Sequence, residues 1–184
     1  MTASKIMVIR HAEKPDDAGT IFGVSVQGNQ DPEELTVRGW QRAGALVTFF
    51  APPDGHFRDQ RIEEAGTIFA SRVAHHSNSL RRQHTVEPLA ELIGPEKLRL
   101  DFSEGEEQQL IPAAVAVDGV ALISWHHEAI PAIKDLLLGD QSSPRNWDNE
   151  RFDLVWVFTR TATGWRFEQV PQLLLAGDKP NPIE

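Results

Sequence analysis

The chain contains no cysteine, which excludes disulfide bonds and thiolate chemistry. This absence is compatible with a reducing compartment. No apolar stretch approaches the roughly 18 residues that a membrane-spanning helix needs, and no long apolar core follows a basic head at the start of the sequence. We therefore expect a soluble, cytoplasmic protein.

An excess of basic residues is also missing, because 27 Asp and Glu stand against 18 Lys and Arg, for a formal net charge of −9. Affinity for nucleic acid or for an anionic membrane depends on basic surface, so neither is an expected partner. Any anion that the protein binds must meet a local positive site. No pattern in the sequence indicates an oligomeric state.

The chain has the length of one ordinary domain, and we expect residues 1–184 to form it. Short β-rich blocks alternate with longer segments of helical period, which indicates an α/β fold. The strand blocks lack polar alternation, as is typical of central strands covered on both faces. We expect a three-layer α/β/α arrangement around a mostly parallel sheet. The expected strands are 5–10, 67–71 and 120–125, with an edge hairpin formed by 152–159 and 165–170.

Three segments have the spacing of helices. Residues 34–50 carry Thr36 as an N-cap, residues 77–94 are expected to break near Pro88, and residues 127–139 end on Gly139. The segment 14–34 is rich in Gly, Pro, Asp and Asn and predicts a long loop. We expect this loop to shape the mouth of a pocket.

Polar and charged residues gather where the expected strands end. Arg10 and His11 follow the first strand, and His126, His127 and Glu128 follow Trp125. Ligands in open α/β sheets bind beyond the carboxyl ends of the strands. The expected strand 67–71 leads to Arg72 and then to the basic turn at Arg81 and Arg82.

Two guanidinium groups beside two imidazoles suit a doubly charged oxyanion, because arginine offers parallel donors that match phosphate. A neutral imidazole can also attack phosphorus. Arg10 and Arg81 would lower the pKa of His11 by like-charge repulsion and keep it neutral near pH 7. The same arginines would stabilise the charge on the transferring group.

Four segments, in this order, resemble the motifs of the histidine phosphatase superfamily, which includes the phosphoglycerate mutases. They are RHAEKP at 10–15, LTVRG at 35–39, SLRRQHTVEPLA at 79–90 and LISWHHEAIP at 122–131. The resemblance implies a phosphoglycerate mutase-like fold and a phosphatase that needs no metal and no other cofactor. By position it implies His11 as the nucleophile that becomes phosphohistidine, and Arg10 and Arg81 as phosphate ligands.

The second histidine of the motif can be aligned with either His126 or His127. We favour His127, because WHHEAIP fits a Trp-x-His-x-x-Ile-Pro ending found in some members; His126 would then be a phosphate-binding neighbour. The usual glycine is replaced by Glu128. Glu128 is the first candidate for the proton donor to the leaving group, and Glu13 is the second.

Mutases usually carry a long lid segment with an acid between the second arginine and the second histidine, and this interval is short here. A hydrolase of a small phosphomonoester is therefore favoured over a phosphoglycerate mutase. A phosphate-binding member without catalysis is the other alternative, since the glycine is missing and the acid is unassigned.

Several neighbouring residues have simpler interpretations. Arg82 is expected on the helix surface, Arg72 in a structural loop, and residues 104–110 at an acidic helix start. His75 and His76, with the pair His126 and His127, could suggest a metal. Adjacent side chains of a strand point to opposite faces, however, and no carboxylate lies at a zinc-motif spacing, so no metal site is predicted.

Overall fold

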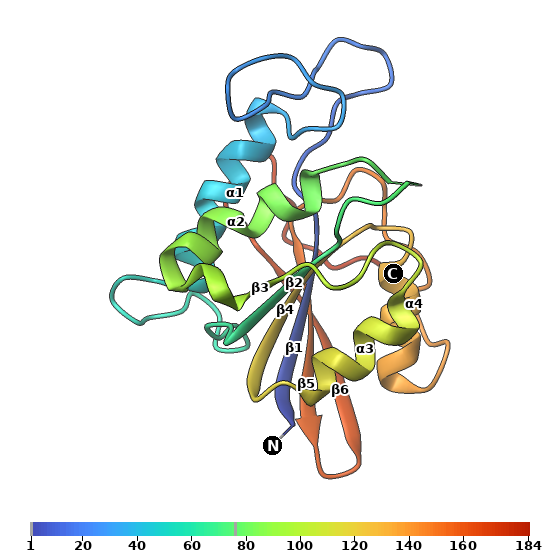
Figure 1. Ribbon diagram of the computed structural model, residues 1–184. Helices are drawn as coiled ribbons and strands as arrows, with labels where there is room; N and C mark the ends of the chain where they lie inside the picture. The colour runs from blue at the N-terminus through green and yellow to red at the C-terminus, as the bar shows by residue number, and fades with distance from the viewer. Residues whose placement is uncertain (1, 76) are drawn as a thin grey trace.

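The computed structural model describes residues 2–75 and 77–184. Its centre is a six-stranded sheet with the order β3-β2-β4-β1-β5-β6 (Figure 1). The strands β3, β2, β4 and β1 are parallel, and β5 and β6 form the antiparallel edge. The expected mostly parallel sheet with an edge hairpin is confirmed. The strands are β1 (Ala3–Arg10), β2 (Thr67–Ala70), β3 (Leu98–Arg99), β4 (Gly119–Trp125), β5 (Leu154–Thr161) and β6 (Gly164–Pro171).

Helices cover both faces of the sheet, as the three-layer prediction requires (Figure 1). The helices α1 (Val37–Phe50) and α2 (Arg81–Ile93) pack on one face, and α3 (Glu107–Ala116) and α4 (Ile130–Leu138) on the other. A single turn of 3₁₀ helix, Pro95–Lys97, leads from α2 to β3. None of the helices in the described part of the chain is long and apolar enough to cross a membrane.

Strand β1 shows why its sequence is almost entirely apolar. Met7 and Ile9 join the core under α1 and α2, while Ile6 and Val8 join the core under α3 and α4. All four side chains are fully buried. Successive side chains of a strand point to opposite faces, so a strand that is covered on both faces needs an unbroken apolar run. Such burial contributes about 1.5–3 kcal/mol for each large aliphatic side chain.

Helix α1 begins as the sequence predicts. The Thr36 hydroxyl accepts the Gly39 N–H at 3.0 Å. A side chain at Gly39 would place its Cβ only 2.6 Å from the Glu13 carbonyl oxygen. The glycine of the LTVRG segment therefore lets α1 approach the backbone that follows β1.

Helix α2 differs from the expectation in two ways. It begins at Arg81 and not at residue 77, and it continues through Pro88 without the predicted break. Proline removes one hydrogen bond from the helix, but Val86, Leu89 and Ala90 on the same helix are buried in the core. Tertiary packing here outweighs the local effect of proline.

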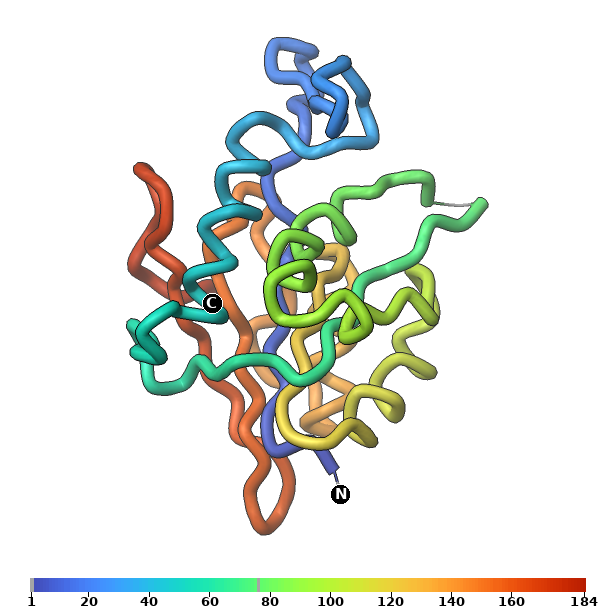
Figure 2. Tube along the Cα trace, turned by 60° about the vertical axis from the view of Figure 1, so that its left-hand side comes forward, coloured from blue at the N-terminus to red at the C-terminus, as the bar shows by residue number. Residues whose placement is uncertain are grey.

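The segment 14–34 forms the expected loop, which extends from the body of the molecule near the start of α1 (Figure 2). Isolated bridges link Gly23 with Thr36 and Val24 with Gln30. The end of the loop is fastened to α2, because the Ser79 hydroxyl donates to the Glu33 carbonyl oxygen and His84 Nδ1 lies 2.6 Å from a Glu34 carboxylate oxygen.

Candidate active site

His11 directly follows β1 and is buried. Its backbone N–H extends the parallel ladder by donating to the Trp125 carbonyl oxygen at 3.1 Å. Its imidazole Nδ1 lies 2.7 Å from the Ala12 carbonyl oxygen. An oxygen acceptor at Nδ1 favours the tautomer with the proton on that nitrogen, so Nε2 carries a free lone pair.

The surroundings of His11 keep its imidazole neutral. Burial lowers the pKa of His11 well below 6.5, and the positive charges of Arg10, Arg81 and Arg82 lower it further. The hydrogen bond to Ala12 opposes this shift without reversing it. The direction is the one that the sequence predicts for a nucleophilic imidazole.

Arg10 is held from one side by the loop after α4. Its Nη1 donates to the Asn149 carbonyl oxygen at 2.5 Å, and its guanidinium carbon lies 3.8 Å from the centre of the Phe152 ring. Burial lowers the pKa of Arg10 to about 10, and Glu150 and Asp148 counteract part of this effect. Its Nε and Nη2 atoms are buried and have no hydrogen-bond partner.

The first turn of α2 brings Arg81 to the same place. Its Nη1 donates to the Pro32 carbonyl oxygen at 2.8 Å, and Nη2 lies 3.7 Å from the Glu33 carboxylate. Thr85, one turn later, accepts the Ala12 N–H at 2.8 Å and donates to the Arg81 carbonyl oxygen at 2.6 Å. Thr85 thereby joins the segment that follows β1 to the start of α2.

The expectation that Arg82 lies on the helix surface is wrong. Its side chain is 3% exposed, and its Nη2 donates to the Glu104 carboxylate at 3.0 Å and to the Ser77 hydroxyl. Its charge lowers the pKa of both His11 and His126. Arg72, by contrast, is the expected loop arginine, paired with Glu106 at 3.0 Å.

Histidines 126 and 127 both reach this end of the sheet. The ring of His126 lies 6.4 Å from that of His11 and 4.8 Å from that of His127. Burial lowers the pKa of His126, and it lowers that of His127 to about 4, where Arg10 adds to the effect. His127 and Glu128 also line a shallow opening with Asn149. The structure thus brings both histidines close to Arg10, with the His126 ring facing His11.

Buried polar atoms without hydrogen-bond partners are concentrated around His11, on Arg10, Arg81, Arg82, His126 and His127. In residues 2–75 and 77–184, eight buried side-chain nitrogen and oxygen atoms have no hydrogen-bond partner, and six of them belong to this cluster. Unpartnered buried polar atoms are rare, and each costs about 1–3 kcal/mol. Guanidinium N–H groups that lack acceptors are suited to binding an anion. The six are Arg10 Nε and Nη2, Arg81 Nε, Arg82 Nε, His126 Nδ1 and His127 Nδ1.

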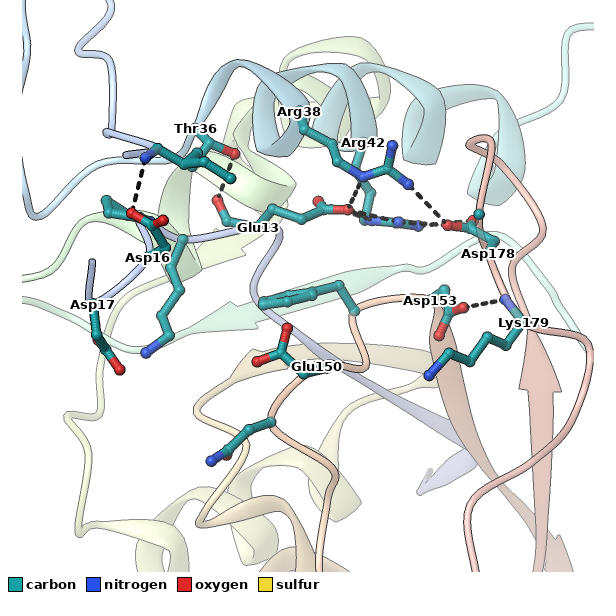
Figure 3. A pocket seen from close by; sticks show the side chains of 16 residues that line it. Glu13, Asp16, Asp17, Thr36, Arg38, Arg42, Glu150, Asp153, Asp178 and Lys179 are labelled. Atoms are coloured by element: carbon teal, nitrogen blue, oxygen red, sulfur yellow. Dashed lines mark hydrogen bonds and ion pairs between the residues drawn. The ribbon is translucent and has the colours of Figure 1, made fainter. Parts of the chain in front are cut away.

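Glu13 belongs, through its carboxylate, to an ion-pair network with Arg38 and Arg42 (Figure 3). Its carboxylate accepts from Arg42 Nη2 at 2.8 Å and from Arg38 Nε at 3.1 Å. Arg42 in turn lies 2.7 Å from Asp178. This network forms one wall of a cavity of about 400 Å³, which Phe152 also lines.

Glu104 lies beside Arg82 and His126, whereas the sequence predicts that it belongs to an acidic helix start. Helix α3 begins only at Glu107, so Glu104 lies in the preceding loop. Its carboxylate contacts Arg82 at 3.0 Å and lies 3.4 Å from His126 Nδ1. The sequence did offer one indication of Glu104: it lies between the second arginine and the second histidine of the motif, the interval in which mutases of the superfamily carry an acid.

No group of three or more His, Asp or Glu residues in the described ranges is arranged to hold a metal ion. His76, which with His75 was considered as part of a possible metal site, lies outside the described residues.

No protein-family model matches the chain, and no curated protein does. Solved structures share its fold. A protein assigned as the phosphohistidine phosphatase SixA of Agrobacterium tumefaciens is 16% identical, with a TM-score of 0.53 over 90% of this chain and 96% of that one. The protein histidine phosphatase SixA complexed with tungstate is 15% identical, with a TM-score of 0.51 over 91% and 97%. A protein assigned as an α-ribazole-5′-P phosphatase of Escherichia coli is 11% identical, with a TM-score of 0.52 over 89% and 94%.

These neighbours define the class of fold. The chain shares the fold of these phosphatases, so the phosphoglycerate mutase-like fold that the four sequence segments imply is confirmed.

Proposed function

We propose that the protein is a phosphatase that hydrolyses a phosphomonoester through a phosphohistidine intermediate on His11. The observation that carries this proposal is the neutral, buried imidazole of His11, whose Nδ1 is taken up by the Ala12 carbonyl oxygen and whose charged neighbours Arg10, Arg81 and Arg82 have unpartnered nitrogens. A neutral imidazole supplies the electron pair, and the guanidinium groups supply the positive field that a transferring phosphoryl group requires.

The reaction has two steps. In the first, the Nε2 lone pair of His11 forms a bond to phosphorus, the bond from phosphorus to the ester oxygen breaks, and a protonated carboxyl group gives its proton to the departing oxygen. In the second, water attacks phosphorus, the P–N bond breaks, and the proton of the water returns to the carboxylate. Arg10, Arg81 and the second histidine hold the phosphoryl oxygens throughout.

The proton donor is a carboxyl group near the second histidine. The sequence favours Glu128 and then Glu13, and Glu104 joins them because of its contact with His126. Glu13 is the weakest of the three, since Arg42 and Arg38 bind its carboxylate. A proton donor matters most when the leaving group is a poor one, and it then contributes about 10²–10⁴ in rate.

The first test is release of p-nitrophenol from p-nitrophenyl phosphate with EDTA present, from acid to neutral pH. Wild type should turn over and His11→Ala should not. Equal turnover by the variant would remove His11 from the mechanism. A wild type that binds vanadate without turning over any monoester would instead identify the phosphate-binding member without catalysis.

The proton donor is tested with two substrates. Glu104→Gln, Glu128→Gln and Glu13→Gln are compared on p-nitrophenyl phosphate and on an alkyl monoester. The variant that lacks the donor should lose far more activity on the alkyl ester, whose oxygen needs the proton. Because one neighbouring structure is assigned as a phosphohistidine phosphatase and another is named a protein histidine phosphatase, a phosphohistidine peptide belongs in the same substrate series.

A further inference from the structure

Arg82 occupies a fixed position beside the nucleophile. It is the second residue of α2, and its carbonyl oxygen accepts a hydrogen bond at 2.8 Å from the hydroxyl of Ser124, which is fully buried near the end of β4. The first turn of α2 is therefore fastened to the strand that leads to His126. A side chain that starts from this point has little freedom to swing into solvent.

The guanidinium group of Arg82 is anchored on one side only. Nη2 is bound by the Glu104 carboxylate at 3.0 Å and by the Ser77 hydroxyl. Nε is buried and has no hydrogen-bond partner. A guanidinium that uses all its N–H groups for structure would not leave this donor unmatched, because burying it costs about as much as a lost hydrogen bond.

The local charge balance points the same way. Arg81 has Glu33 at 3.7 Å, Arg82 has Glu104 at 3.0 Å, and Arg10 is held by carbonyl oxygens. Within residues 2–75 and 77–184 Arg10 forms no ion pair, while Glu150 and Asp148 compensate part of its charge at longer range. An entering dianion would compensate the remaining positive charge.

We propose that Arg82 is a third phosphoryl-binding guanidinium, which donates from Nε to a phosphoryl oxygen that Arg10 and Arg81 leave free. This proposal rests on the proposed function, because it places the phosphoryl group at His11. Three guanidinium groups can face the three equatorial oxygens of a transferring phosphoryl group separately. A merely structural Arg82 would serve only to hold Glu104.

The test measures binding of inorganic phosphate and of vanadate by calorimetry, which does not depend on turnover. The variants are Arg82→Gln and Arg82→Lys, with Arg72→Gln as the matched control. Arg72 forms an equally short pair with an acid two residues from Glu104 and lies outside the site. Arg82→Gln should weaken phosphate binding by about tenfold or more, because it removes a charge-assisted donor. Arg72→Gln should bind like wild type.

The lysine variant separates the two roles of Arg82. It keeps the charge and can still pair with Glu104, but it has no Nε donor at the guanidinium position. We expect it to bind phosphate at least about threefold more weakly than wild type. Binding within twofold of wild type by Arg82→Lys would overturn the proposal, even if Arg82→Gln binds poorly.

A pH profile adds a readout that a loss of stability does not move. Arg82 lowers the pKa of His11, so Arg82→Gln should raise that pKa and shift the acid limb of kcat/KM to higher pH. An unshifted limb in a folded Arg82→Gln enzyme would contradict the placement beside His11. Phosphate binding by a wild type without turnover would overturn the catalytic function and leave the binding test of Arg82 decisive.

Discussion

The hydroxyl of Thr85 accepts the backbone N–H of Ala12 at 2.8 Å, and this contact ties the residue after His11 directly to helix α2. Both residues are fully buried. Thr85 also donates to the Arg81 carbonyl oxygen. The Thr85 side chain therefore helps to set the position of His11 relative to the arginines of α2.

Replacing Thr85 with valine should destabilise the protein and lower its activity. Valine keeps the shape of threonine but leaves the Ala12 N–H buried without an acceptor, at a cost of about 1–3 kcal/mol in unfolding free energy. Urea unfolding measures this cost, and p-nitrophenyl phosphate turnover reports the site. Thr48→Val is the control, because the Thr48 hydroxyl bonds within α1 at an exposed position. Equal stability of the two variants would contradict the assignment.

Replacing Glu13 with glutamine should lower stability more than catalysis. The Glu13 carboxylate binds Arg42, whose side chain is 2% exposed, so its loss should cost about 1–3 kcal/mol. Asp101→Asn, which removes the partner of Arg99 in an ion pair exposed on both sides, is the control and should cost less than about 1 kcal/mol. An unchanged urea midpoint together with a selective loss of alkyl-ester turnover would instead identify Glu13 as the proton donor.

Stability should fall as the pH is lowered from about 7 to 5. The pKa values of His11, His126 and His127 are lowered in the folded protein, mainly by burial. The unfolded chain therefore binds protons from a pH near 6.5 downward, while the folded chain binds fewer protons at these positions, and the unfolding free energy decreases.

Urea midpoints at pH 7.5 and 5.0 measure this effect. His127→Asn should lose less stability between the two values than wild type, because one of the three titrating groups is gone. His56→Asn, at a side chain that is 87% exposed, is the control and should behave like wild type. An equal loss in wild type and His127→Asn would show that His127 does not contribute.

Phosphate should stabilise the folded protein. A ligand at one hundred times its Kd raises the unfolding free energy by about 2.7 kcal/mol when it binds only the folded state. Arg10→Gln should abolish most of this gain, since Arg10 supplies two of the unpartnered donors. Arg160→Gln is the control. Arg160 also stacks on an aromatic ring, that of Trp165, but it lies beside Ala3 at the start of β1, whereas Arg10 lies at the end of that strand. The gain is measured as a shift of the urea midpoint at constant ionic strength.

The sequence predicted the parts of the site that follow from strand ends. Arg10 and His11 lie where an apolar run stops, and a parallel sheet brings that point next to the end of β4. The buried position of Arg82 and its contact with Glu104 were not predicted, because they depend on segments that are distant in sequence, including Ser124. The position of Arg82 on a predicted helix did not show whether its side chain would lie on the buried or the exposed face of that helix.

The ion pairs of Glu13 also could not be predicted from the local sequence pattern. Its partner Arg42 lies on α1, and Arg42 is shared with Asp178 from the segment after β6. The predicted break at Pro88 failed for a related reason, since local propensity competes with burial in the core. Strand and helix types were readable from periodicity, whereas the contacts between distant segments required the structure.

The central place of β1 in the sheet also sets the order in which the molecule can assemble. Its two neighbours, β4 and β5, both come from the second half of the chain: Ile6 pairs with Ala121 on one side and with Phe158 on the other. A ribosome therefore makes β1 long before either of its partner strands, and long-range pairing of this kind is slow. A nascent chain that ends before residue 148 has neither β5 nor the loop carbonyls that hold Arg10, so the surroundings of Arg10 are completed only late in synthesis.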